Sequence, residues 1–233
     1  MNIKNFFGMM RTTIARVESI DNPYDDYFTV KMNVKADRSW APGEHAIFSL
    51  PHMNVEGKKW RPFSVASAPE EGYMMIGTRT GSEISGFKKV FLSLEPGDPV
   101  KVRGPYGCFK LQDAITPLVL VAGGVGITPI RAILKQLEKD KEHKTYLIYT
   151  ARDYHLFGEE IEKMASNNPA LDIYLTKSSK EAKARVAELA NSLGAQAYYY
   201  LSGAPGFVKS VRKQIMGHDV SSKRIIFDPL IGF

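Results

Sequence analysis

The sequence has 233 residues and a formal net charge of +6, with 44% hydrophobic and 24% charged residues, proportions that are ordinary for a globular protein of one large or two small domains. No apolar run approaches membrane-spanning length, and the N-terminal stretch MNIKNFFGMMR lacks the hydrophobic centre of a signal peptide. Cys108 is the only cysteine, which excludes an internal disulfide and an all-cysteine zinc or iron–sulfur site.

The composition also bears on location and partners. A single cysteine is most simply explained by a reducing, cytoplasmic location, and we expect neither a metal centre nor a membrane span. The positive charge favours acidic partners. Acidic residues are interspersed throughout and no Lys/Arg block resembles a nucleic-acid tail, so we expect no nucleic-acid partner.

The chain from residue 11 to about residue 103 is predicted to be mostly β-structure. Short apolar runs are separated by turn sequences such as DNP, APG and EPGD. Short strands separated by such turns predict a small antiparallel β-barrel, with a brief helix over 87–94 before its last strand. The predicted strands are 12–17, 27–34, 45–50, 63–66, 73–80 and 99–103.

From residue 117 onward the pattern changes to alternating strands and helices. Such alternation predicts a doubly wound α/β domain, in which helices cover both faces of a parallel sheet. We therefore expect two domains, 1–112 and 113–233. The predicted strands are 118–122, 146–149, 172–175, 198–201 and 224–227, and the predicted helices are 128–139, 157–165, 180–193 and 205–216.

The stretch PLVLVAGGVGITP joins the first strand and helix of this second domain. Gly123, Gly124 and Gly126 permit a tight turn against a ligand, and Thr128 is expected to cap the following helix. A strand, a glycine turn and a helix N-terminus together favour a site for a phosphate or another electron-rich group. The alternative is an ordinary tight connection in a parallel α/β protein.

Two motifs in the predicted barrel suit a phosphorylated ring compound. In RPFS, Arg61 can bind a phosphate through two hydrogen bonds, and Phe63, on the same side of an extended strand, can offer a flat face to a ring system. In GSEISGF, Ser85 is expected to be the N-cap of the short helix, with backbone N–H groups available to an anion. The alternatives are an edge strand with one solvated arginine and a capped helix without a ligand.

A third motif, GPYGCF, predicts a glycine-bracketed turn directly after the last barrel strand. Its Cys108 fits a small buried residue better than a reactive thiol.

The order RPFS, GSEISGF, GPYGCF, VAGGVGITP and YLSGAPGF resembles the ferredoxin–NADP reductase superfamily from about residue 11 to residue 233. In that family a barrel that binds FAD or FMN precedes an α/β domain that binds NAD(P). The resemblance implies that Arg61 holds the flavin phosphate, Phe63 lies against the isoalloxazine and Ser64 hydrogen-bonds near its N5/O4 edge. The rest of the implied flavin-binding set is Pro62, Ile76, Gly77, Thr78, Ser85 and Gly86.

The resemblance also implies a nicotinamide site formed by two loops. The first loop contributes Gly123, Gly124, Gly126 and Thr128, and the second contributes Ser202, Gly203, Ala204 and Pro205. With Ser64, Thr128 and Ser202 form the set expected beside the reacting rings. Many relatives carry cysteine where this chain has Ser202, whose hydroxyl can still hydrogen-bond. The C-terminal FDPLIGF resembles the acidic-then-aromatic ending of the family, so Phe233 either covers the flavin ring or closes the domain.

Three cations bear on the choice between NADP and NAD. Arg152 and Lys177 follow neighbouring predicted strands, and Arg185 lies downstream. This arrangement is similar to that of relatives in which cations bind the 2′-phosphate of NADP. Solvated surface charge is the alternative.

The resemblance therefore implies a flavin-dependent NAD(P)H oxidoreductase. It would pass electrons through FAD, or FMN, to an acidic protein such as ferredoxin or flavodoxin. The alternatives are a flavin or ferric reductase with a small-molecule acceptor, and a non-catalytic electron-transfer module of a larger complex.

Overall fold

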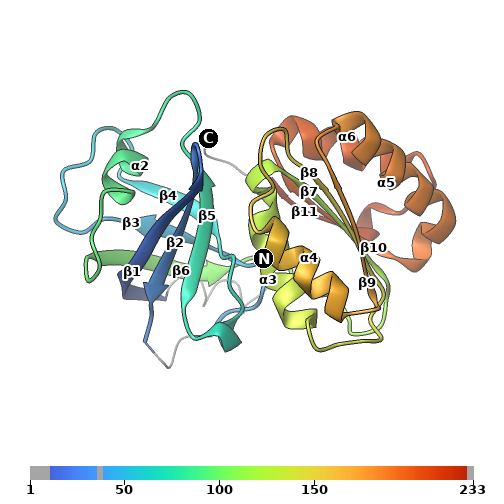
Figure 1. The fold of residues 1–233 in the computed structure, drawn as a ribbon, viewed down its shortest axis with the longest axis horizontal. Helices are drawn as coiled ribbons and strands as arrows, with labels where there is room; N and C mark the ends of the chain where they lie inside the picture. Colours follow the sequence, from blue (N-terminus) through green and yellow to red (C-terminus); the bar gives the residue numbers. More distant parts are fainter. Residues whose placement is uncertain (1–10, 36–38, 230–233) are drawn as a thin grey trace. The chain divides into compact units, whose positions relative to one another are not determined.

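The structure is a computed structural model that describes residues 11–35 and 39–229. Within these ranges the chain forms two compact units, the first ending at Lys110 and the second beginning at Leu111. Figure 1 draws the first in blue to green and the second in yellow-green to red. The boundary expected from the sequence lay between residues 112 and 113.

The first unit contains an antiparallel sheet with the strand order β4-β3-β6-β1-β2-β5. Its two outermost strands are linked, because the Ala66 N–H donates to the Met75 carbonyl at 2.7 Å and the Met75 N–H donates to Ser67 Oγ at 2.9 Å. The sheet thus curls into the predicted barrel. Its strands are β1 (Thr12–Tyr24), β2 (Tyr27–Asn33), β3 (His45–Ser49), β4 (Trp60–Ser64), β5 (Met74–Arg79) and β6 (Pro99–Tyr106).

The barrel core follows from residue alternation along the strands. In β3 and in the first half of β1, every second side chain is buried and its neighbours are not. The helix α2 (Gly86–Phe91) adds Phe87 and Phe91, which are fully buried among the inward side chains of the strands. Burial of each ring contributes roughly 1.5–3 kcal/mol, so α2 is anchored by its aromatic residues.

Two turns predicted in the barrel are wrong. The DNP sequence lies inside β1, which pairs with β2 up to Tyr24, and the chain reverses at Asp25 and Asp26 instead. Pro23, which has no N–H, is tolerated there because it falls at an irregularity of the ladder between Asp21 and Tyr24. The expected GPY turn is likewise the end of β6, because Tyr106 pairs with His45.

The second unit contains a parallel sheet with the strand order β11-β10-β7-β8-β9, which confirms the predicted doubly wound fold. Its strands are β7 (Leu118–Gly123), β8 (Thr145–Thr150), β9 (Leu171–Thr176), β10 (Tyr198–Gly203) and β11 (Ile225–Pro229). Its longer helices are α3 (Ile127–Leu137), α4 (Gly158–Asn167), α5 (Ser179–Leu193) and α6 (Pro205–Met216).

Helices cover both faces of this sheet. Side chains of α5 and α6 form one core with Val119, Val121 and Tyr199, while α3 and α4 lie on the other face (Figure 1). The strand order reverses at β7, which has β8 on one side and β10 on the other. In open α/β sheets, ligands bind at the carboxyl ends of the strands where the order reverses. The fold therefore indicates a ligand site at the loops after β7 and β10.

No helix within residues 11–35 and 39–229 is both long enough and apolar enough to cross a lipid bilayer.

Candidate functional site

Arg61 lies on the inward side of β4. Its Cα pairs with that of Phe48, whose side chain is in the barrel core, and the Arg61 guanidinium lies 5.9 Å from the Phe87 ring centroid. The guanidinium donates from Nη1 to the carbonyls of Lys58 and Trp60, at 3.2 and 3.0 Å. The arginine is therefore held beside α2 by its own strand.

Phe63 shares the inward side of β4 with Arg61, and its ring belongs to an aromatic cluster. It stacks on Phe91 at 5.8 Å with an interplanar angle of 17°, and it meets Phe48 edge-on at 5.6 Å. The half-buried ring thus fills the barrel, and its contact with a flavin stays a prediction. Ser64, the next residue, is buried.

The N-terminus of α2 is built as the sequence indicates. Ser85 is the N-cap, and its Oγ accepts the Lys88 N–H at 3.4 Å. A Cβ at Gly86 would lie 2.4 Å from the Glu56 carbonyl oxygen, so only glycine fits there. The expected contact of these residues with a flavin pyrophosphate stays a prediction.

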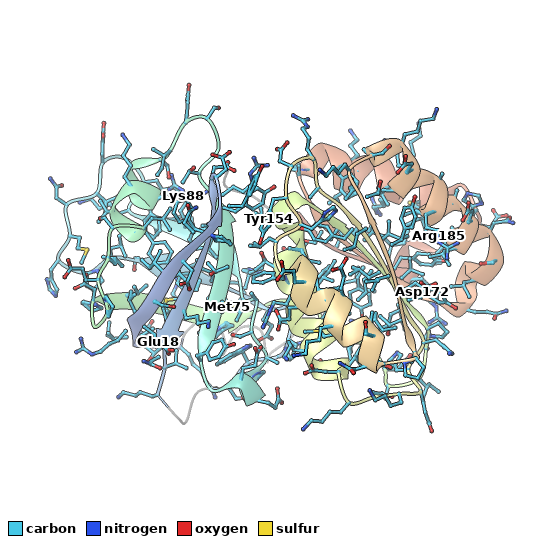
Figure 2. The ribbon with its side chains drawn as sticks, viewed as in Figure 1. Glu18, Met75, Lys88, Tyr154, Asp172 and Arg185 are labelled. Carbon is cyan, nitrogen blue, oxygen red and sulfur yellow. The ribbon has the colours of Figure 1, made fainter. Side chains whose placement is uncertain are left out.

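Lys88 is a cation at this position that the sequence analysis missed. Its side chain is buried in the first turn of α2, and Nζ donates to the Arg79 carbonyl (Figure 2). Burial is the largest cause that lowers the pKa of Lys88, Arg61 lowers it further, and the Asp26 carboxylate partly opposes both. Two neighbouring cations at a helix N-terminus, one of them buried, favour an anionic ligand. The sequence could have indicated this cation, because Lys88 stands three residues after the N-cap Ser85 and therefore in the first turn of the helix.

Of the other barrel residues in the implied flavin set, Pro62 lies on β4 between Arg61 and Phe63, and the rest lie on β5. Ile76, Gly77 and Thr78 are buried and pair with β2, and β5 is at one end of the strand order. Their flavin contacts stay predictions.

The expectation for Cys108 is wrong, because its side chain is exposed. Cys108 lies in a bend beyond the end of β6, between Gly107 and Phe109, which are both buried.

Thr128 is not the N-cap of α3, which corrects the sequence expectation. The glycine turn forms a short 3-10 helix, Gly124–Gly126, and α3 begins at Ile127, so Thr128 lies within its first turn. The Thr128 hydroxyl donates to the Val125 carbonyl at 2.7 Å. The N-cap residue of α3 is Gly126, so no side chain caps the backbone N–H groups at the start of this helix.

The loops after β7 and β10 interlock through their backbones. A Cβ at Gly126 would lie 2.3 Å from the Ser202 carbonyl oxygen, and a Cβ at Gly203 would lie 3.1 Å from the Gly123 carbonyl oxygen. Gly124, with φ +55, has no atom within 4 Å of its Cβ position and faces open space. The structure thus brings together the two loops that the sequence places far apart, at the reversal point of the sheet.

Ser202 is fully buried at the end of β10, and its hydroxyl has no hydrogen-bond partner among the described residues. A buried polar group without a partner costs about 1–3 kcal/mol. An orphaned hydroxyl beside a glycine turn fits a polar ligand group such as a nicotinamide carboxamide. Its role beside the nicotinamide stays a prediction.

The cations expected near a 2′-phosphate are not all in one place. Arg152 and Lys177 are exposed and follow the paired ends of β8 and β9. Arg185 instead contacts Asp172 at 3.5 Å and Glu188 at 2.9 Å (Figure 2). Asp172 lies near the start of β9, about 16 Å along the strand from Lys177 at roughly 3.3 Å per residue. The structure therefore separates Arg185 from the other two cations.

Another cation missed from the sequence lies at the N-terminus of α5. Lys180 is exposed in the first turn of this helix, two residues after the N-cap Ser178 and three after Lys177. The Ser178 hydroxyl accepts the Glu181 N–H at 3.2 Å. A capped helix start with nearby cations suits a phosphate. The SSKE sequence, residues 178–181, is the pattern that indicates such a capped start.

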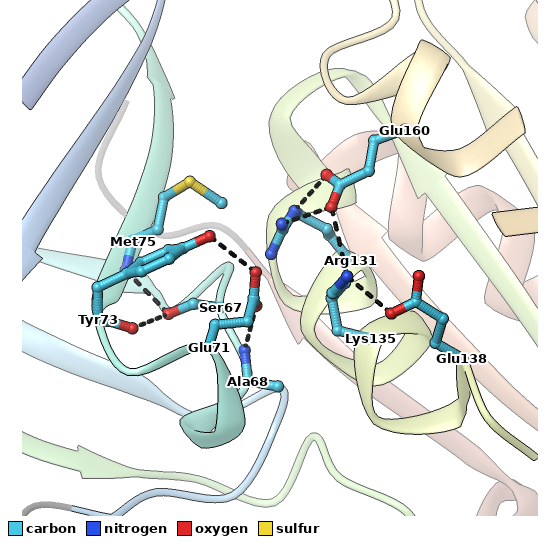
Figure 3. A network of polar contacts seen from close by, with 9 residues as sticks. All are labelled: Ser67, Ala68, Glu71, Tyr73, Met75, Arg131, Lys135, Glu138 and Glu160. Atoms are coloured by element: carbon cyan, nitrogen blue, oxygen red, sulfur yellow. Dashed lines mark hydrogen bonds and ion pairs between the residues drawn. The ribbon is translucent and has the colours of Figure 1, made fainter. Parts of the chain in front are cut away.

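A buried ion pair fixes the helix that follows the glycine turn. Arg131 of α3 donates to both carboxylate oxygens of Glu160 on α4, at 2.7 and 2.6 Å (Figure 3). The Arg131 guanidinium also lies 5.2 Å from the Phe157 ring centroid. Lys135 extends this network to Glu138 at 2.8 Å. Because the Arg131 side chain is buried and doubly hydrogen-bonded, it holds α3 and α4 together.

Some expectations lie outside the described residues. Phe233 is one of them, so its placement over the flavin stays a prediction. Within the described ranges, no group of three or more His, Cys, Asp or Glu side chains is arranged to hold a metal ion.

Comparisons with known proteins agree with the two-unit fold. Residues 120–213 match the model of the oxidoreductase NAD-binding domain family. A flavohemoprotein of Vibrio cholerae is 25% identical over 231 residues, which cover 94% of this chain and 58% of that protein. An NADH-cytochrome b5 reductase 1 of Dictyostelium discoideum is 31% identical over 165 residues, covering 63% of this chain and 56% of the relative.

Solved structures share the fold over nearly the whole chain. The FAD/NAD-binding domain of a nitric oxide dioxygenase from Vibrio cholerae superposes with a TM-score of 0.77 at 22% identity, covering 93% of this chain and 97% of that one. A ferredoxin-NADP+ reductase from Plasmodium falciparum, solved with 2'P-AMP, gives 0.78 at 17% identity, covering 94% and 96%. The chain spans about half the length of the first curated relatives, 47%, 58% and 54% of three flavohemoproteins.

Proposed function

We propose that this chain belongs to the ferredoxin–NADP reductase superfamily and is a flavin-dependent NAD(P)H oxidoreductase. The proposal depends on one observation at the reversal point of the sheet: the Gly126 turn packs against the Ser202 carbonyl, and the Ser202 hydroxyl is buried without a hydrogen-bond partner among the described residues. The turn offers backbone N–H groups at a helix start, and the hydroxyl offers a hydrogen bond. Together they fit a nicotinamide nucleotide.

The barrel supplies residues that fit a flavin nucleotide. Arg61 and Lys88 are the cations for its phosphates, beside the Ser85-capped start of α2. Gly86 leaves no room for a Cβ, so the backbone of α2 packs directly against Glu56. A flavin held by these residues would supply the hydride-acceptor and one-electron-donor chemistry of the reaction. We propose FAD as the flavin because the relatives solved with a bound flavin include an FAD-containing flavohemoglobin.

The overall reaction oxidises one NAD(P)H and reduces two one-electron carriers, with release of one proton. The protein's own tasks are to bind and orient the two nucleotides. Ser202 positions the nicotinamide by a hydrogen bond, and the flavin edge is positioned by Ser64. An acidic ferredoxin or flavodoxin is the acceptor that suits the net charge of +6.

The proposed dinucleotide is NADP. Arg152, Lys177 and the newly located Lys180 surround the carboxyl ends of β8 and β9 and the start of α5, where a 2′-phosphate would bind. Arg185 is left out of this set because its guanidinium is engaged by Asp172 and Glu188.

Anaerobic titration of the purified, full-length protein tests the proposal. We expect a yellow protein whose colour bleaches on addition of NADPH, and a released pigment with the mass of FAD. A protein that retains flavin but is bleached by neither NADPH nor NADH would be an electron-transfer module instead. Turnover with free riboflavin or ferric complexes, but with neither protein carrier, would make it a small-molecule reductase.

A pair of arginine variants tests the flavin site. Arg61→Ala should lose flavin on dialysis, whereas Arg103→Ala, an exposed arginine on β6 of the same barrel, should retain it. Equal retention by both variants would show that Arg61 does not hold the flavin phosphate.

A further inference from the structure

The outward side chains of β4, β3, β6 and β1 form two straight rows, which we call the outer face of the barrel. The strand registers set these rows: Trp60 pairs with Ser49, Ser49 with Lys101, and Lys101 with Ile14. The second row is built in the same way. The outer face consists of Trp60, Ser49, Lys101, Ile14, Pro62, Ile47, Arg103 and Thr12.

The outer face is positively charged. Lys101 and Arg103 lie side by side on β6, both are exposed, and neither forms an ion pair with any residue that the structure describes. At the edge of the face, Lys58 Nζ lies 3.7 Å from the Trp60 ring centroid, and Arg16 follows Ile14 on β1. None of the eight side chains of the face is a carboxylate. The face therefore attracts an acidic surface.

The outer face also has an apolar element. Trp60 and Ile14 stand at opposite ends of the first row, with exposed fractions of 41% and 44%. They are about 14 Å apart, because three strand spacings of roughly 4.8 Å separate them. Exposed tryptophan and arginine are the side chains that most often dominate binding energy at protein interfaces. Apolar anchors with cations between them are typical of a docking surface.

We infer that the outer face docks an acidic electron-carrier protein, and this inference rests on the proposed reductase activity. A second copy of this chain is a poor occupant, because a symmetric contact through this face would bring its cations against each other. A lipid surface is also disfavoured, because Trp60 and Ile14 lie on a sheet and not on a protruding loop. β4 carries Trp60 on this face and Arg61 on the opposite side, so one strand joins the docking surface to the proposed flavin site.

Steady-state reduction of three acceptors by the full-length holoenzyme tests the inference. The acceptors are a [2Fe–2S] ferredoxin, a flavodoxin and ferricyanide, each with NADPH as donor. The double variant Lys101→Glu/Arg103→Glu is compared with Lys139→Glu/Lys144→Glu, which makes the same charge change at exposed positions of the other unit. Trp60→Ala tests the apolar element separately.

We expect Lys101→Glu/Arg103→Glu to raise the KM for ferredoxin or flavodoxin about tenfold or more, with an effect that fades at high salt. The KM for ferricyanide should not change, and the control variant should shift the protein-carrier KM less than about twofold. Trp60→Ala should raise that KM at every salt concentration.

Three results would overturn the inference. The first is equal KM values for the outer-face and control variants, and the second is failure of the wild type to reduce either carrier while it still reduces ferricyanide. The third is binding to lipid instead of a carrier: the wild-type protein sediments with vesicles of phosphatidylserine and phosphatidylcholine, and Lys101→Glu/Arg103→Glu abolishes this sedimentation without changing the KM for ferredoxin or flavodoxin. Failure of the wild type with ferricyanide would instead refute the proposed reductase activity.

Discussion

Replacement of Gly126 by alanine should separate the two loops of the proposed nicotinamide site. The Gly126 backbone has φ −61 and ψ −12, which alanine adopts readily, so any effect arises from the added methyl group alone. That methyl carbon would lie 2.3 Å from the Ser202 carbonyl oxygen, whereas ordinary contact begins at 3.4 Å. The backbone must therefore move by about 1.1 Å, the difference between 3.4 and 2.3 Å.

The size of this movement sets the expected effects. A misplacement of about 1 Å costs on the order of 100-fold in rate, so flavin reduction by NADPH should slow by about that factor. Overpacking typically costs roughly 1–3 kcal/mol, so the free energy of unfolding should fall by that amount. The flavin content should not change, because Gly126 belongs to the second unit.

Stopped-flow reduction under anaerobic conditions and urea unfolding measure the two effects. Gly206→Ala is the matched control, because its Cβ would meet no atom within 4 Å and it lies in the first turn of α6. This control should keep the wild-type rate and gain about 0.5–1 kcal/mol of stability. A Gly126→Ala protein with the wild-type rate and stability would refute the interlocked loops as the nicotinamide site.

Four further predictions concern the cations and their partners. Lys88→Met should weaken FAD binding to the apoprotein about 10- to 100-fold, since a charged hydrogen bond contributes roughly 1.5–3 kcal/mol. In the wild type, FAD affinity in fluorescence titrations should fall as pH rises through the pKa of Lys88, which burial holds below the ordinary value of 10.5, because binding must then first protonate the amine. Glu160→Ala should destabilise the protein to urea by about 2–3 kcal/mol, because it removes the carboxylate that the buried Arg131 binds. In steady-state assays, Arg152→Ala should raise the KM for NADPH and spare that for NADH, whereas Arg185→Ala should change neither.

Each of these predictions has a control or a contrary outcome. A pH-independent FAD affinity in the wild type would show that Lys88 does not contact the flavin phosphate. Glu138→Ala, which removes an exposed ion pair, should cost less than about 1 kcal/mol, and an equal loss in both glutamate variants would contradict the role given to burial. A selective NADPH defect in Arg185→Ala would restore the interpretation made from the sequence.

Local features of the barrel were predictable when they depended on neighbours in the chain. Ser85 was recognised as an N-cap because a cap is formed by residues three positions apart. The DNP and GPY turns were mispredicted because β1 and β6 continue wherever a partner strand supplies hydrogen bonds, and the partner is distant in sequence. Cys108 was misplaced because it lies in a bend beyond the end of β6.

The sequence by itself determined the class of each unit and their order, because hydrophobic periodicity and glycine turns are properties of short segments. Only the tertiary structure decided that Gly126 abuts Ser202, that Lys88 is buried beside Arg61, and that Arg185 lies away from Lys177. Strand register and helix packing between distant segments fix these contacts, and neither is encoded in local pattern.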